Sequence, residues 1–266
     1  MVQNSVRVIV RSAFFLASCL FLAAEQSAAP LPSAEDVVGK VCAASPRFDR
    51  QIGYNFQKYS LSEELDKEGN AKEKKEKQFD IIWTNQVMTV RLVSLNGVPQ
   101  NGKLRTDAPH GKPSKGQRTT VDSFLKNDII DRFQIEVIAR EQINDRPTLV
   151  LTFKPHPKGL PVHSIEDRVI NKLAGTVWID EMDYQVAKCD LHLVERATMM
   201  GGIVAALDQF TLSLTRIRMA EGTWLNEHSL FQMSGRKLFD SFAVRVTEHA
   251  DSFRKFDLGE LAHMRQ

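Results

Sequence analysis

Strong net charge is absent from this sequence. Its 266 residues include 35 basic and 33 acidic side chains, which leaves a formal net charge of +2. Nucleic-acid-binding proteins usually carry a clear basic excess on one face. The balance gives no support to nucleic acid as a partner.

The motifs of common hydrolase and metal sites are also missing. The chain has no His-Glu-x-x-His helix, no Gly-x-Ser-x-Gly elbow and no cysteine pair at zinc spacing. Asp190 and His192 lie two apart on one side of an expected strand, but no nucleophile can be assigned to them. We therefore predict a protein that is not an enzyme and that needs no metal or other cofactor.

The N-terminal apolar run is too short to span a bilayer comfortably. It covers residues 12–24, follows Arg7 and Arg11, and precedes small residues at 27–29. This layout is typical of a secretory signal peptide, which we place at residues 1–29. An alternative is that Leu16 to Cys19 form a lipobox, so that Cys19 would carry a membrane anchor.

Cysteine is scarce. Of the three residues, Cys42 and Cys189 would remain after removal of the signal peptide. In an oxidising compartment these two could form a disulfide. Cys189 also lies in an apolar row, where a buried free thiol is equally natural. Both alternatives stay open at this point.

Alternating hydrophobicity, in contrast, is abundant. Between Leu173 and Glu195, two extended segments flank an acidic turn at residues 180–183, and after the turn apolar residues alternate with Lys188, Asp190 and His192. This pattern predicts a strand with one buried face. Most of the remaining chain repeats it, so we expect a large, curved antiparallel sheet in a single domain over residues 30–256, followed by a tail at 257–266.

Three helices are expected, and the second and third of them should pack onto this sheet. The first begins after Ser33, which is a good N-cap; the second covers residues 119–133; the third begins near Ser164. Neither the second nor the third helix can bury its apolar stripe by itself. The expected stripes are Val37, Val38 and Val41; Leu125, Ile129 and Phe133; and Ile165, Val169 and Leu173.

The apolar residues of the sequence include many flexible and aromatic side chains. Phenylalanine outnumbers tyrosine by 15 to 3, and Met199 and Met200 precede a glycine pair. A curved sheet covered by a few short helices can leave an apolar cavity, and such cavities bind acyl chains by burial of area, without a sequence motif. The plainer alternative is that these residues are ordinary core. The candidate lining residues are Trp83, Met199, Met200, Ile203, Phe210, Leu212, Leu214 and Phe231, with Leu125, Ile129 and Val169 as a lid.

The export signal, the opening helix and three patterned segments resemble the LolA-like group of outer-membrane lipoprotein-sorting proteins. The segments are YNFQKYSLSEELDKEGN, TVWIDEMDYQVAKCDL and the stretch from Phe210 to Val246, and the resemblance extends over about Val37 to Phe256. It implies a mainly β (α+β) fold: an unclosed antiparallel half-barrel of about ten to eleven strands, with helices covering the concave face.

The resemblance also implies a function. Such a protein would be a periplasmic carrier that holds lipid or lipoprotein acyl chains in an apolar cavity, and it would exchange them with membrane-bound donor or acceptor proteins. One alternative on the same fold is a periplasmic sensor that acts through a membrane protein. Another is a secreted hydrolase built on Asp190 and His192.

Overall fold

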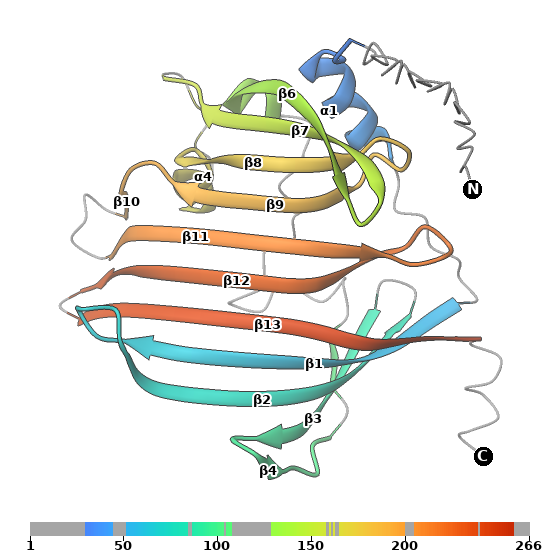
Figure 1. Ribbon diagram of the computed structural model, residues 1–266. Helices are drawn as coiled ribbons and strands as arrows, with labels where there is room; N and C mark the ends of the chain where they lie inside the picture. Colours follow the sequence, from blue (N-terminus) through green and yellow to red (C-terminus); the bar gives the residue numbers. More distant parts are fainter. Residues whose placement is uncertain are drawn as a thin grey trace, which may run out of the picture. The chain divides into compact units, whose positions relative to one another are not determined.

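A computed structural model of the chain describes residues 30–44, 52–84, 87–103, 105–107, 129–157, 160, 162, 165–199, 205–238 and 240–257 (Figure 1). The chain divides into two units, residues 1–30 and 31–266, and the fold described below is that of the second. The predicted signal peptide, Cys19 and most of the predicted tail lie outside the described residues.

A single antiparallel sheet of 13 strands dominates this unit. Eleven strands follow one another in the order β4-β3-β2-β1-β13-β12-β11-β9-β8-β7-β6, while β5 pairs with β3 and β10 with β11. Among the described strands, β4 and β6 end this order without pairing with each other, so the sheet is an unclosed half-barrel. The strands are β1 (Ile52–Leu65), β2 (Ala71–Thr84), β3 (Val87–Leu95), β4 (Val98–Pro99), β5 (Arg105–Asp107), β6 (Phe133–Ile143), β7 (Arg146–Pro155), β8 (Leu173–Asp180), β9 (Val186–Leu193), β10 (Ala197–Met199), β11 (Ala205–Arg218), β12 (Trp224–Lys237) and β13 (Asp240–Asp257).

Tight turns join most neighbours in the sheet. The β6–β7 turn consists of Asn144 and Asp145, with φ of 50° and 59°. Two central residues with positive φ match the right-handed twist of the flanking strands, and Asn and Asp tolerate that conformation. The last strand is different, because β13 pairs not only with β12, which precedes it in the chain, but also with the first strand, β1. This pairing joins the N-terminal hairpins to the rest of the sheet.

The opening helix, α1 (Ala34–Ala43), forms as its sequence predicts. The Ser33 side chain accepts a hydrogen bond from the Asp36 backbone N–H at 3.2 Å, which caps the first turn. Val37, Val38 and Val41 on its apolar stripe are buried. Figure 1 shows α1 beside β6 and β7.

The two other described helices are short. α3 (Ile129–Arg132) is the end of the predicted second helix, whose residues 119–128 lie outside the described residues. α4 (Ile165–Ile170) is the predicted third helix. Leu173, expected on its stripe, instead begins β8, because the helix ends at Ile170 and a turn follows.

The buried apolar residues form two clusters. The first joins α1 and α3 to β6–β9 and β11, and it includes Phe133, Leu149 and Ile179. The second consists, among the described residues, of strand and turn residues at one end of β1, β2, β11, β12 and β13, and it includes Tyr54 and Ile81. The described helices therefore contribute to one cluster only.

Candidate ligand-binding face

An apolar strip that is only half-buried crosses β11, β12 and β13. Leu212 lies opposite Phe231, which lies opposite Val246 on the next strand. A second row lies two residues away on each strand and hence on the same face. All six side chains keep part of their surface exposed. This open strip consists of Phe210, Leu212, Phe231, Met233, Val244 and Val246.

The open strip continues the face of the first core cluster. Leu214, the next residue on this face of β11, is 4% exposed and belongs to that cluster. Phe210 and Leu212 pack against the same cluster. The rings of Phe210 and Phe231 meet edge to face, with centroids 5.4 Å apart. On the β11 side, the buried core thus continues into the partly exposed apolar surface of the open strip, with no polar boundary between them.

A half-buried ion pair between β13 and β1 borders the open strip on the side away from β11. Glu248 lies two residues beyond Val246 on β13, and its Oε1 is 3.1 Å from Nζ of Lys58 on β1. The Ser229 hydroxyl donates to Glu248 Oε2 at 3.4 Å, and Lys58 Nζ also lies 5.5 Å from the ring centroid of Phe79. The face therefore carries charge between the open strip and the second cluster.

The structure brings together only part of the predicted cavity lining. Phe210, Leu212 and Phe231 are neighbours in the open strip, whereas Leu214 is core. Trp83 lies apart in the second cluster, with its ring 6.2 Å from that of Tyr54. Met199 ends β10, with only its backbone described, and Met200 and Ile203 lie outside the described residues.

The predicted lid residues have different positions. Ile129 on α3 is 6% exposed and packs in the first cluster beside α1, so it is a core residue of the described structure. Val169 on α4 is half-buried. Leu125 lies outside the described residues. That these three residues form a lid remains a prediction.

Half of the open strip and its ion pair were not predicted from the sequence. Val244 and Val246 alternate with Ala243, Arg245 and Thr247 on β13, so their shared face was visible as a pattern. Met233 follows the same alternation on β12. Lys58 and Glu248 are 190 residues apart, and only the pairing of the first strand with the last brings them together.

Cys189 is a free thiol, so the predicted disulfide between Cys42 and Cys189 does not form in this structure. Cys189 lies on β9 in the first cluster with none of its surface exposed, whereas Cys42 is exposed on α1. Burial and, second, the charge of Asp190 raise the pKa of the Cys189 thiol to about 12. The buried thiol that the sequence left open is the arrangement found.

This difference predicts a selective thiol reaction. In the variant Cys19→Ser, the folded protein should react with a thiol reagent at Cys42 alone, because the thiolate is the reactive form and Cys189 is both buried and protonated near pH 8. The second thiol should appear only after unfolding in urea. Mass spectrometry of the alkylated protein checks this, and rapid modification of Cys189 in the folded protein would contradict it.

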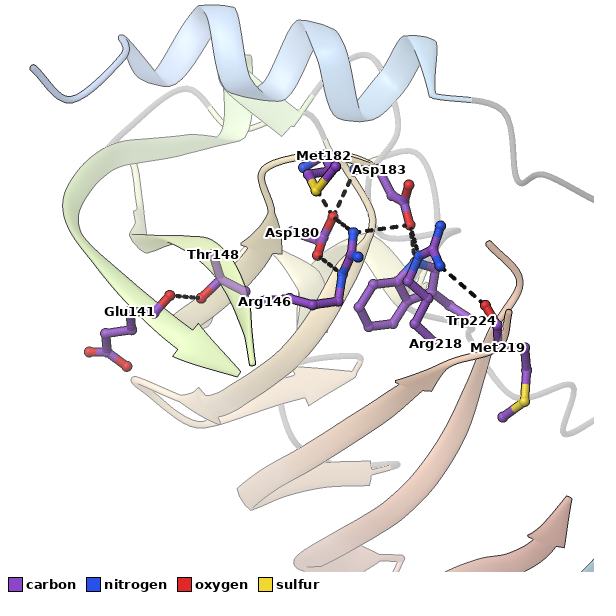
Figure 2. Close-up of polar contacts among 9 residues, drawn as sticks. All are labelled: Glu141, Arg146, Thr148, Asp180, Met182, Asp183, Arg218, Met219 and Trp224. Carbon is purple, nitrogen blue, oxygen red and sulfur yellow. Dashed lines mark hydrogen bonds and ion pairs between the residues drawn. The ribbon is translucent and has the colours of Figure 1, made fainter. Parts of the chain in front are cut away.

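A buried carboxylate organises the β8–β9 turn (Figure 2). Asp180 has no exposed surface, and its carboxylate accepts two hydrogen bonds from the Arg146 guanidinium, at 2.6 and 2.8 Å. Its Oδ1 also accepts the backbone N–H groups of Met182 and Asp183, at 3.0 and 2.7 Å. Asp180 therefore holds together the acidic turn that the sequence predicts at residues 180–183.

Asp183 extends this network to the β11–β12 end of the sheet. Its Oδ2 accepts hydrogen bonds from Arg218 Nε and, at 3.2 Å, from Trp224 Nε1, and lies 3.6 Å from Arg146 Nη2. Burial raises the pKa of Asp183, but these donors and the charges of Arg218 and Arg146 outweigh it, so the pKa lies below its usual value. Arg146 thus contacts both aspartates, and Arg218 contacts Asp183.

The proposed hydrolase dyad does not form. Asp190 accepts a hydrogen bond from the Ser213 hydroxyl at 2.6 Å and pairs with Lys188 at 3.1 Å, and His192 bonds to no described residue. Among the described residues, no three His, Cys, Asp or Glu side chains are grouped to hold a metal ion. No helix in the described ranges has the length and apolar character to cross a membrane.

Comparisons with known proteins add similarity in structure only. No family model and no curated protein matches the chain. Among solved structures, the chain is similar to a LolA superfamily protein from Nitrosomonas europaea, with 12% identity and a TM-score of 0.36 over 87% of this chain and 97% of that one. It is similar to a putative outer membrane lipoprotein-sorting protein domain from Vibrio parahaemolyticus, with 12% identity and a TM-score of 0.32 over 86% and 96%.

A third similar structure is the complex of MucA and MucB from Pseudomonas aeruginosa, with 10% identity and a TM-score of 0.29 over 83% of this chain and 98% of that one. The LolA superfamily, which the sequence resembles, is thus among the proteins found. Likenesses with such TM-scores do not assign a function, which has to come from the residues of this chain.

Proposed function

We propose that this protein is a non-enzymatic periplasmic carrier that binds lipid or lipoprotein acyl chains on the open strip, in the service of lipoprotein sorting. The observation that carries the proposal is the open strip itself: six apolar side chains on one face of three adjacent strands, all half-buried and continuous with the core. Contiguous apolar surface of this kind is typical of a binding site for an apolar ligand.

The surroundings of the open strip favour an amphiphile over a purely apolar ligand. An acyl chain would bury area against Phe210, Phe231 and their neighbours without directed bonds. The Lys58–Glu248 pair at the border offers polar groups whose side chains are 17% and 18% exposed. In this proposal a membrane-bound protein would load or receive the cargo.

A pair of substitutions on β12 tests the carrier directly. Phe231→Asp places a carboxylate in the open strip, where an acyl chain would have to desolvate it, and we expect most of the bound lipid to be lost. Leu230→Asp is the matched control, because Leu230 is the preceding residue, points to the opposite face and is 40% exposed. Native mass spectrometry after expression with export, followed by organic extraction and lipid analysis, measures the occupancy.

The outcomes separate cleanly. Wild type and L230D should carry near-equimolar lipid or acylated peptide, and F231D should be largely empty although it is folded. A folded F231D that keeps its lipid would remove the open strip from the proposal. A wild-type protein that is ligand-free after export would overturn the carrier function. If F231D does not fold, Val246→Asp with Thr247→Asp as its control repeats the test on β13.

A further inference from the structure

A separate pocket lies between two hairpin turns at one end of the sheet. It has a volume of about 170 Å³, and its walls come from the β6–β7 turn and from the end of β11 and the start of β12. One ordered water needs roughly 10–15 Å³ by the same measure, so the pocket has room for a polyatomic group. It is lined by Asn144, Arg146, Ile217, Arg218, Met219, Ala220 and Trp224.

Two arginines in this wall are fixed in place by buried aspartates (Figure 2). Arg146 uses Nε and Nη2 to bind Asp180, and Arg218 uses Nε to bind Asp183 and Nη1 to bind the Met219 carbonyl at 3.3 Å. Among the described contacts, Nη1 of Arg146 and Nη2 of Arg218 have no partner. Each of these nitrogens carries two N–H donors, so up to four donors stay available beside the pocket.

Their positions suit an anion that comes from solvent. The Arg146 and Arg218 side chains are 22% and 25% exposed, whereas those of Asp180 and Asp183 are 0% and 6% exposed. The two carboxylates are thus more buried than the guanidinium groups, and the described lining of the pocket contains no acidic side chain. Guanidinium groups held rigid bind oxyanions with little loss of side-chain entropy.

The remaining walls are partly apolar. Ile217 and Met219 also pack against the second core cluster, and Trp224 is 8% exposed. The adjacent acidic residue, Glu221, is engaged elsewhere, by the Tyr54 hydroxyl and the Lys255 ammonium. A charged group bound by the arginines would therefore have apolar side chains next to it.

We propose that this pocket binds a phosphate group, through the free N–H donors of Arg146 and Arg218. The phosphate could belong to a phospholipid headgroup or be the free ion, because both present the same oxyanion. The site is distinct from the open strip, and its binding of inorganic phosphate does not depend on the carrier function.

Substitution at Ala220 tests the site without removing any member of the arginine network. Ala220 is exposed and lines the pocket, so Ala220→Glu would add a competing carboxylate there. Ala220→Gln is the matched control with the same shape and no charge. Isothermal titration of the full chain with inorganic phosphate, and separately with dihexanoyl phosphatidylglycerol below its micelle concentration, measures both ligands.

We expect both wild type and A220Q to bind, and A220E to bind at least about tenfold more weakly, because a like charge a few ångströms away costs that much even in a polar surface environment. In F231D, whose open strip should no longer hold acyl chains, tighter binding of the lipid than of phosphate would identify the headgroup as the source, and equal affinities would identify the free ion. The proposal is overturned if wild type binds neither ligand at millimolar concentration, or if A220E and A220Q bind alike with unchanged melting temperatures.

The phosphate titration of F231D separates this site from the carrier function. F231D should bind inorganic phosphate as wild type does, whatever happens to its acyl cargo. Loss of phosphate binding in a folded F231D would mean that the arginine pocket is not an independent site and would contradict the inference.

Discussion

Replacement of Asp180 by alanine is expected to lower the free energy of unfolding by about 3–5 kcal/mol, the typical cost of removing one partner from a buried ion pair. The substitution leaves the Arg146 guanidinium without its bidentate acceptor and leaves two backbone N–H groups of the turn without theirs. Because Asp180 has no exposed surface, water cannot replace the carboxylate without local opening.

Urea unfolding of the wild type and variants measures this loss. Asp190→Ala is the control, since its carboxylate pairs with Lys188 but is 39% exposed, and exposed pairs contribute at most about 1 kcal/mol. Asp180→Asn keeps an acceptor but not the charge, and should fall between the two. If D180A lost no more than D190A, the buried pair would not hold this end of the sheet together.

A double-mutant cycle with Arg146→Ala gives the pairwise part of the effect. In D180A the guanidinium of Arg146 lacks its main partner, so removing it as well should cost less than removing it from wild type. The expected coupling is favourable and lies within about 0.5–3 kcal/mol. Additive losses would show that each residue acts through other contacts.

Local features of the fold were largely predictable from the sequence. Alternation located the long strands, and Ser33 marked the start of α1. The count of about ten to eleven strands matches the eleven in the main order of the sheet. These features depend on residues close in sequence, because the period of the apolar residues and the capping of a helix are both local effects.

Features that depend on distant pairing were not predictable in the same way. Alternation shows that Trp83 and Phe231 each have an apolar face, but it does not show where along the sheet they lie. β2 is separated from β12 by β1 and β13, and Trp83 lies at the end of β2 that joins the second cluster. The arginine pocket was missed for the same reason, since its walls are turns more than 70 residues apart in the chain.

Phe133→Ala should have a second large effect, a loss of about 3–5 kcal/mol in the free energy of unfolding, as is typical when a buried aromatic ring is truncated. Phe133 is 2% exposed and its ring meets that of Phe153 edge to face at 5.1 Å. It is the first residue of β6, directly after α3, and it shares a core cluster with Val37 and Val38 of α1.

Ile138→Ala on the same strand is the control, because Ile138 is 47% exposed and should change stability by less than about 1 kcal/mol. Hydrogen exchange adds a local readout. α1 should lose protection in F133A before the strands of the second cluster do, because the helix packs in the first cluster only. Uniform loss of protection in both clusters would contradict this local effect.

The position of Phe133 explains why its loss should be so costly. Among the described strands, β6 is the last in the sheet order and pairs with β7 alone. A terminal strand has backbone hydrogen bonds on one side only, so its attachment relies on side-chain packing more than that of a central strand does. Phe133 supplies that packing at the point where helix and edge strand meet. A cavity there would weaken both β6 and the helix that precedes it. The open strip should keep its geometry, because β7, β8 and β9 separate its nearest strand, β11, from β6.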